Sequence, residues 1–146
     1  YTLSLHDALP ISNWEILDSD DADFTTAKGR EVMEKYLQKY KDIDVVVSQN
    51  DDMTFGAIEA IRAAGKTTGT GGDITLISFD GTRSALEKVK SGVINVDIEC
   101  NPLQGTYIQE IINRLEDGES VDKINYVEEK VYTQKNVLSV LGDRVY

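Results

Sequence analysis

The chain has 146 residues and is strongly acidic, with 26 Asp and Glu, 15 Lys and Arg, and a formal net charge of −11. A surface this negative repels phosphate backbones and anionic lipid headgroups, so we expect no nucleic-acid partner and no direct membrane insertion. No apolar run approaches the roughly 20 residues that span a bilayer, and a 40% hydrophobic share is enough for one domain with a real core.

The origin of the first twelve residues, YTLSLHDALPIS, is a separate question. Back-translated into codons, they resemble a widely used short-read sequencing adapter, whereas the alternative is a genuine short amphipathic start. We therefore expect residues 1–12 to be an adapter-derived scar that is not native, and exclude them from reasoning about the fold. They contain His6, the only histidine, so histidine-based catalysis and most catalytic zinc sites are excluded with them.

The next segments, in chain order, predict a strand, a helix and a second strand. Residues 14–20, WEILDSD, are expected to form a strand. Residues 25–40 carry Met33, Tyr36, Leu37 and Tyr40 at the spacing of one helix face. Residues 42–50, DIDVVVSQN, form a continuous apolar run that ends in polar residues, which is typical of a buried strand.

The middle of the chain repeats this alternation. Residues 51–65 predict a helix with acids at its start and Gly65 after its end, and 73–80, DITLISFD, predict a third strand. Residues 82–92 predict a short helix and 93–100, VINVDIEC, a fourth strand. The linker 65–73, GKTTGTGGD, leads from a helix into a strand, so it favours a turn; phosphate loops lead from a strand into a helix.

The last part begins with a helix at 102–118, in which Ile108, Ile111, Ile112 and Leu115 share one face. Residues 124–146 predict a strand, hairpin-like, followed by an irregular tail. Strands that alternate with helices indicate an α/β fold, here an incomplete parallel sheet with helices on both faces.

Ligands of open parallel sheets bind at the carboxyl ends of the strands. The four predicted strands lead to Phe24, to Asn50 with its neighbours, to Asp80, and to Cys100 and Asn101. Amides, a carboxylate and an aromatic face suit a polyhydroxylated ring such as a sugar.

Each position also has a structural interpretation. We expect Asp51 or Asp52 to cap the following helix, which leaves Asn50 for a ligand. Asp80 precedes Gly81 in FDGT, where it serves a turn or a ligand. Phe24 could belong to the core, and Cys100 is expected to be a small buried hydrophobe.

Enzymatic and metal-binding functions are not indicated. DSDDADF has Ala22 where a calcium loop needs its third oxygen ligand and Asp23 where it needs glycine. No spacing of carboxylates singles out an acid and base pair. We therefore expect no enzyme, no metal and no cofactor.

Four segments together resemble a known family: DFTTAKGREVMEKYL, VVVSQNDDMTFGAIEAIRAAG, ITLISFDGT and SGVINVDIECNPLQG. In this order they are similar to the C-terminal half of the periplasmic sugar-binding proteins of ABC importers, of the ribose-binding type, over about residues 14–135. ECNPLQG and the ending VYTQKNV…LGDRVY look most similar to galactofuranose-binding members. The resemblance implies a monosaccharide ligand, a membrane permease as partner, and a periplasmic location, or an extracellular lipoprotein in a Gram-positive source.

The resemblance also implies roles for residues. Asn50 and Asp80 match positions where the family hydrogen-bonds sugar hydroxyls, and Phe24 matches an aromatic residue that packs on the sugar. Cys100 or Asn101 stands where ribose binders often have glutamine, which argues against ribose itself.

The family has two lobes joined by three crossings. The implied organisation is a C-terminal sugar-binding lobe at 13–100 that lacks its first elements, a hinge crossing and a helix of the other lobe at 101–123, and a C-terminal strand and tail at 124–146. The alternative is the ligand-binding core of a LacI-type repressor, which shares the lobes. The segment SGVINVDIECNPLQG looks like the importer proteins and unlike the repressors.

Overall fold

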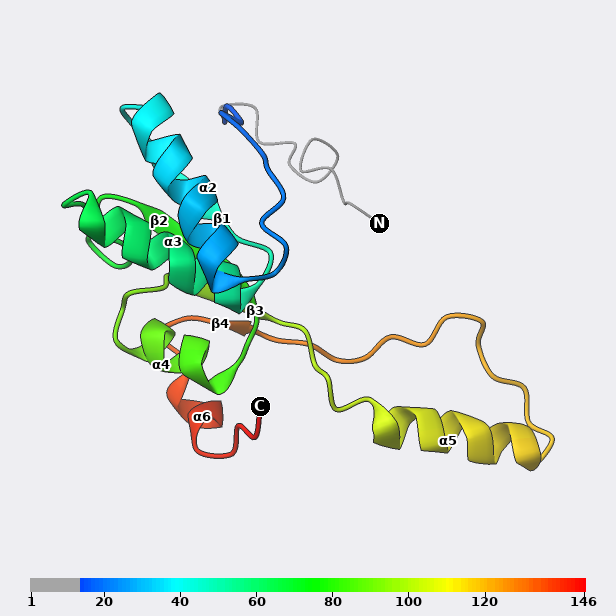
Figure 1. Ribbon diagram of the computed structural model, residues 1–146. Helices are drawn as coiled ribbons and strands as arrows, with labels where there is room; N and C mark the ends of the chain where they lie inside the picture. The colour runs from blue at the N-terminus through cyan, green and yellow to red at the C-terminus, as the bar shows by residue number, and fades with distance from the viewer. Residues whose placement is uncertain (1–13) are drawn as a thin grey trace.

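The computed structural model describes residues 14–146, so the predicted scar lies outside the described residues. A four-stranded sheet organises the chain, in the order β1 (Val45–Val47), β2 (Thr75–Asp80), β3 (Val96–Glu99) and β4 (Val131–Tyr132). The first three strands are parallel, and β4 runs antiparallel to β3. The predicted α/β fold is confirmed, and the predicted parallel sheet is formed except for its last strand (Figure 1).

Within residues 14–146, five helices connect or flank these strands: α2 (Thr26–Lys39), α3 (Asp51–Ala63), α4 (Arg83–Lys90), α5 (Gly105–Glu116) and α6 (Leu138–Leu141). The first four agree with the predicted helices. Side-chain caps begin three of them, from Thr25, Asn50 and Thr82.

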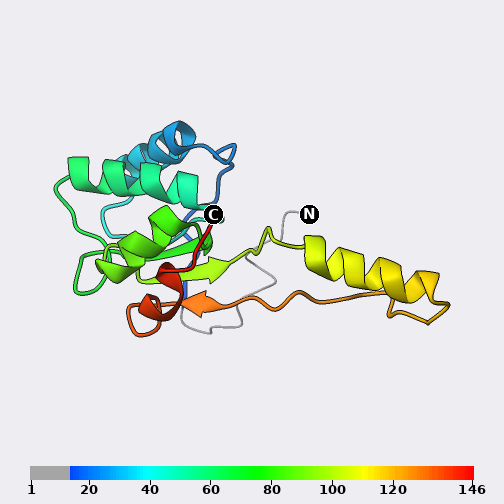
Figure 2. The same ribbon diagram turned by 90° about the horizontal axis from the view of Figure 1, so that it is seen from below.

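The core lies between the helices and one face of the sheet. One apolar cluster joins Leu76 of β2 to Leu86 and Val89 of α4 and to the C-terminal residues Val137 and Leu141. A second cluster joins Met33 of α2 to Ile61 of α3. Figure 2 shows α2 and α3 together on one side of the strands.

We expected helices on both faces of the sheet. Within residues 14–146, both apolar clusters lie against one face, while Val45, Ile77 and Phe79 of the opposite face are partly exposed and belong to neither cluster. The strands β1, β2 and β3 are added in a single direction. Right-handed connections then place α3 and α4 on the same side.

The strand predicted at 14–20 is not formed, since residues 14–22 have no regular structure. The segment is instead held by polar contacts to α2. Asp18 and Asp20 pair with Lys39 and Lys35, each at 2.8 Å, and the hydroxyl of Tyr40 donates to the carbonyl of Leu17 at 2.7 Å. An apolar run becomes a strand only beside a partner that completes its hydrogen bonds.

Helix α5 is formed as predicted, but none of its residues is buried. Figures 1 and 2 show it standing away from the sheet, at the end of two extended segments. Its large apolar side chains are exposed, including Ile108, Ile112 and Leu115. We call residues 100–130 the arm, and residues 26–99 with 131–146 the body.

The C-terminal region contains the predicted strand, because β4 pairs with β3 at Asp97↔Tyr132 and Ile98↔Val131. The prediction of an irregular tail is wrong. Helix α6 follows, and Val137 and Leu141 are buried against α4 and β2 in the first cluster. Burial of these two apolar side chains fixes the tail on the body.

Candidate functional site

Three of the predicted ligand residues meet at the carboxyl ends of β1, β2 and β3. The side-chain amide of Asn50 donates to the carboxylate of Asp80, with Nδ2 and Oδ2 at 2.6 Å. The backbone N–H of Cys100 donates to the carbonyl of Asp80 at 3.1 Å. The edge predicted from the strand ends therefore exists as a connected polar surface.

Asn50 also caps helix α3, a role that the sequence analysis predicts for Asp51 or Asp52. Its Oδ1 accepts from the backbone N–H of Met53 at 3.2 Å, so Asn50 is the N-cap of α3. The prediction that Asp51 or Asp52 caps this helix is wrong. A carboxamide has separate acceptor and donor ends, so Asn50 caps with its oxygen while its nitrogen faces Asp80.

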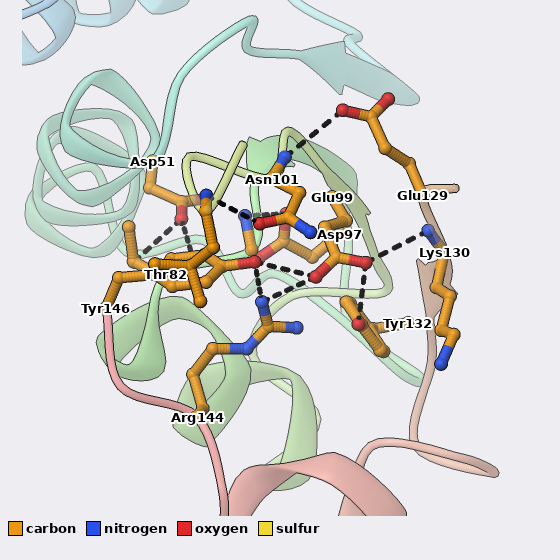
Figure 3. A network of polar contacts seen from close by, with 12 residues as sticks. Asp51, Thr82, Asp97, Glu99, Asn101, Glu129, Lys130, Tyr132, Arg144 and Tyr146 are labelled. Atoms are coloured by element: carbon orange, nitrogen blue, oxygen red, sulfur yellow. Dashed lines mark hydrogen bonds and ion pairs between the residues drawn. The ribbon is translucent and has the colours of Figure 1, made fainter. Parts of the chain in front are cut away.

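Asp51 is only 1% exposed and anchors the turn after β2. Its Oδ1 accepts from the Ser78 hydroxyl at 2.5 Å, and its Oδ2 accepts from the N–H and the hydroxyl of Thr82 at 2.8 and 2.7 Å (Figure 3). Sequence reasoning missed this role, because the partners lie 27 and 31 positions away and no local pattern indicates them.

Asp80 lies in a strained position at the end of β2. Its φ is +111°, which side-chain-bearing residues rarely adopt, and Gly81 follows with φ +74°. Burial raises the pKa of Asp80, the hydrogen bond from Asn50 opposes this, and the negative charge of Asp51 adds to it. Backbone strain of this kind clusters at ligand sites, where the surroundings hold it in place.

Phe24 is 69% exposed and lies outside both core clusters, so it is not a core residue. A close approach of two helices follows it in the chain. A Cβ on Gly56 would lie 2.0 Å from the carbonyl oxygen of Thr26, so the first turn of α2 packs directly against α3. Phe24, two residues before Thr26, therefore exposes its ring near this helix crossing.

Cys100 is exposed, so the prediction of a small buried hydrophobe is wrong. Partial desolvation of the thiol, with the charges of Glu129 and Asp80, raises its pKa and keeps it protonated. Asn101 lies at the beginning of the arm and bonds within it: its N–H donates to Glu129 at 3.1 Å (Figure 3), and its Oδ1 accepts from the N–H of Leu103 at 2.8 Å. The structure joins Cys100 to Asp80, but records no hydrogen bond from Asn101 to Asn50 or Asp80.

A second polar cluster, which the sequence did not reveal, surrounds Glu99. Its Oε1 accepts from Arg144 at 2.6 Å and Tyr146 at 2.7 Å, and its Oε2 accepts from the Tyr132 hydroxyl at 2.9 Å (Figure 3). Burial alone would raise the pKa of Glu99, but Tyr146, Arg144 and Tyr132 together lower it. The partners lie 33 to 47 positions away, and the only available indication was an acid at an inward position of an apolar strand.

A groove of about 320 Å³ lies beside this cluster. Glu99, Tyr146, Lys130 and Tyr107 are among its lining residues, whereas Asn50 and Asp80 are not. The groove separates the C-terminal tail from the beginning of the arm. The groove is therefore separate from the polar edge at Asn50 and Asp80.

Among residues 14–146, no three His, Cys, Asp or Glu side chains gather in a way that could hold a metal ion. No helix in the same range combines the length and the apolar character that crossing a bilayer requires.

The chain is similar to a known protein family and to individual members of it. Residues 5–120 match the periplasmic binding protein domain family. The chain is 35% identical over 122 residues to a ribose import binding protein of Bacillus subtilis, and 33% identical over 124 residues to a galactofuranose-binding protein of Escherichia coli. These alignments cover 83% and 82% of this chain, and 38% of each relative.

A solved structure from Mycobacterium smegmatis, in complex with β-D-fucofuranose, superposes with a TM-score of 0.81 at 36% identity. The match covers 92% of this chain and 43% of that one. The chain thus spans less than half the length of the relatives that it matches.

Proposed function

Because the chain belongs to the periplasmic binding protein family, we propose that it is part of the substrate-binding component of an ABC-type sugar importer, which captures a monosaccharide. The observation that carries the proposal is the Asn50–Asp80 pair, joined at 2.6 Å at the strand ends where such sheets bind ligands. The relatives named for ribose import and galactofuranose binding support the same function.

The chemistry of the edge fits a sugar. In the proposed complex, Asp80 accepts hydrogen bonds from hydroxyls, and Asn50, which donates one N–H to Asp80, donates its second N–H to the same ring. The exposed ring of Phe24 covers the apolar C–H face. Hydroxyl pairs of a pyranose or furanose need this combination, whereas a carboxylate-rich edge disfavours anionic ligands.

The domain organisation is likewise a proposal. Residues 13–100 and 124–146 supply one wall of the sugar cleft, and 101–123 form a hinge crossing and a helix of the opposite lobe. The lack of any buried residue in α5 supports this interpretation, because its apolar face needs a partner. Residues 1–12, outside the described region, are proposed to be the adapter-derived scar.

A furanose-like hexose or a pentose is the proposed ligand, with galactofuranose foremost. The galactofuranose-binding relative and the fucofuranose complex support a five-membered ring. Cys100 is a small neighbour of Asp80 on this edge, and Asn101 is the proposed contact from the hinge side. A small side chain at residue 100 leaves space for a substituent larger than those of ribose.

The proposed partner is the membrane permease of the importer, and the proposed location is the periplasm, or the outer face of the membrane as a lipoprotein. Binding, not catalysis, is the proposed activity. The relatives named above are import and binding proteins, which favours an importer over the ligand-binding core of a LacI-type repressor.

The test uses the full-length parent protein and calorimetric titration with galactofuranose, ribose and related sugars. Asn50→Ala and Asp80→Ala each leave sugar polar groups unpaired, which should weaken binding by about 1 to 3 kcal/mol. Asn113→Ala, which removes an exposed amide of α5, serves as the control and should bind like the wild type. Unchanged affinity in both site variants would contradict the proposal.

The 146-residue chain without the rest of its parent should bind these sugars only weakly. One wall leaves part of the ligand in water, where each hydrogen bond contributes little net free energy, and it cannot bury the 70 to 90% of ligand surface usual for such pockets. Micromolar binding by a monomer of the chain would show that the site is complete without a second lobe.

A further inference from the structure

Two buried carboxyl groups lie behind the Asn50–Asp80 edge, and the proposed function uses neither of them directly. Asp51 at the start of α3 is 1% exposed and Asp97 in β3 is 0% exposed. Ser78 connects them in the structure: it is the register partner of Asp97 across β2 and β3, and its hydroxyl donates to Asp51. Consecutive residues of one turn bind one carboxyl each, since Gly81 N–H donates to Asp97 at 3.2 Å and Thr82 N–H donates to Asp51 at 2.8 Å.

The hydrogen bonds of the two groups are unequal. Asp51 accepts three, from one hydroxyl and from both donors of Thr82, as an ionised carboxylate does. Asp97 accepts only one, and its Oδ2 is fully buried without a partner. A buried, unpaired carboxylate oxygen is costly, whereas protonation of Oδ2 removes the negative charge and makes this oxygen a hydrogen-bond donor.

No cation compensates a second negative charge here. Asp51 of α3 and Asp80 of β2 act on Asp97 with their negative charges. Tyr132 of β4 is its register partner, and Glu99 follows two residues later on β3. Arg144, the buried cation of the described residues, is engaged by Glu99, and Arg83 donates to the Arg144 carbonyl. Most of the remaining groups are acids, which disfavour ionisation of Asp97 further.

We propose that Asp97 keeps its proton at neutral pH and acts as a positioning residue: it donates to Asp51 and accepts from Gly81, and so holds the turn that presents Asp80. In Figure 3, Asp97 lies between Asp51 and the Glu99 cluster. The two carboxyls fix the Gly81 and Thr82 N–H groups, and the strained φ of +111° at Asp80 lies directly before them. The role of this turn in ligand binding rests on the proposed sugar site. The protonation of Asp97 is independent of that proposal.

The electrostatics agree with the geometry. Burial, followed by the charge of Asp51, raises the pKa of Asp97 to about 8, from an ordinary value of 3.8. The folded state therefore retains a proton that the unfolded chain loses above about pH 4. The contribution of this proton to the free energy of unfolding is therefore complete below about pH 4 and decreases as the pH rises from 4 to about 8. Above about pH 8 it no longer changes.

Asp97→Asn is the decisive variant, because an amide copies a protonated carboxyl with one donor and one acceptor. Urea unfolding of the 146-residue chain between pH 4 and 9 compares it with the wild type. The folding equilibrium constant of the wild type should fall relative to the variant by up to tenfold per pH unit between about pH 4 and 8. As a control, Asp52→Asn changes an exposed neighbouring residue, and its stability should depend on pH as that of the wild type does. Parallel profiles of wild type and Asp97→Asn would overturn the proposal.

Backbone NMR separates positioning from stability. The Gly81 and Thr82 amide signals should shift with one midpoint near pH 8 in the wild type and stay constant in Asp97→Asn. Absence of that titration in the folded wild type would refute the positioning role. In the full-length parent, the sugar affinity of the wild type should decrease with a midpoint near pH 8, and that of Asp97→Asn should not. A wild-type affinity that does not change near pH 8 would also contradict the positioning role. Loss of sugar binding by wild type and variant at every pH would refute the proposed function and leave the protonation result standing.

Discussion

The body and the arm contain helices of similar sequence character that differ completely in their surroundings. In the body, α3 buries seven of its residues, including Ile58 and Ile61, between α2 and the sheet. In the arm, α5 has a regular stripe of isoleucines and buries none. The same periodicity thus forms both helices, but only one of them contributes to a core.

The polar groups show the same contrast. Arg144 and Glu99 of the body form an ion pair at 2.6 Å in which both side chains are at least nine-tenths buried. Arg114 and Glu119 of the arm form a pair at 2.9 Å with side chains about half exposed. Solvent screening makes the second pair weak, whereas the first is protected and surrounded by tyrosine hydroxyls. Burial, not the presence of a pair, therefore decides what each contributes.

Removing one partner of each pair should give the largest difference between the regions. Arg144→Ala leaves the Glu99 carboxylate buried without its cation and should lower the free energy of unfolding by about 3 to 5 kcal/mol. Arg114→Ala in the arm should change it by at most about 1 kcal/mol. Urea unfolding of both variants measures the difference, and equal losses would show that the arm is part of the cooperative unit.

Truncating one leucine in each region should give a somewhat smaller difference. Leu86 of α4 is fully buried, so Leu86→Ala should cost roughly 2 to 5 kcal/mol through lost burial and a cavity. Leu115 of α5 is exposed, so Leu115→Ala should leave the unfolding midpoint of the chain almost unchanged. If Leu115→Ala were as destabilising as Leu86→Ala, the contrast between the two regions would be contradicted, since α5 would then have a packing partner in solution.

Changing the surface of the arm should affect association but hardly affect stability. An exposed apolar stripe favours self-association, so the chain should be heavier than a monomer by light scattering at high concentration. Ile112→Glu, on the stripe, should lower that mass. Gln109→Glu adds the same charge to the same helix outside the stripe and should not. A monomeric wild type would contradict this prediction.

The outcome at particular residues shows how far sequence patterns reach. The run VVV and the strand TLISFD predicted β1 and β2, and their ends correctly brought Asn50 and Asp80 together. The cap of α3 was assigned to the wrong residue, because Asn, Asp and Asp in succession are all good caps. Only the packing of β2 against α3 decides that Asp51 is inside and Asn50 is the cap.

The sequence by itself determined what depends on neighbouring residues: the alternation of strands and helices, the apolar stripe of α5, and the polar ends of the strands. These follow from periodicities of two and 3.6 residues, which short segments carry alone. The tertiary structure decided what depends on distant residues: the absence of a strand at 14–22, the Glu99–Arg144 cluster, and the two buried carboxyls, Asp51 and Asp97, that bind the turn after Asp80. Hydrogen bonds and ion pairs between residues 16 to 47 positions apart leave no periodic trace, because their energy comes from burial, and burial exists only after the chain has folded.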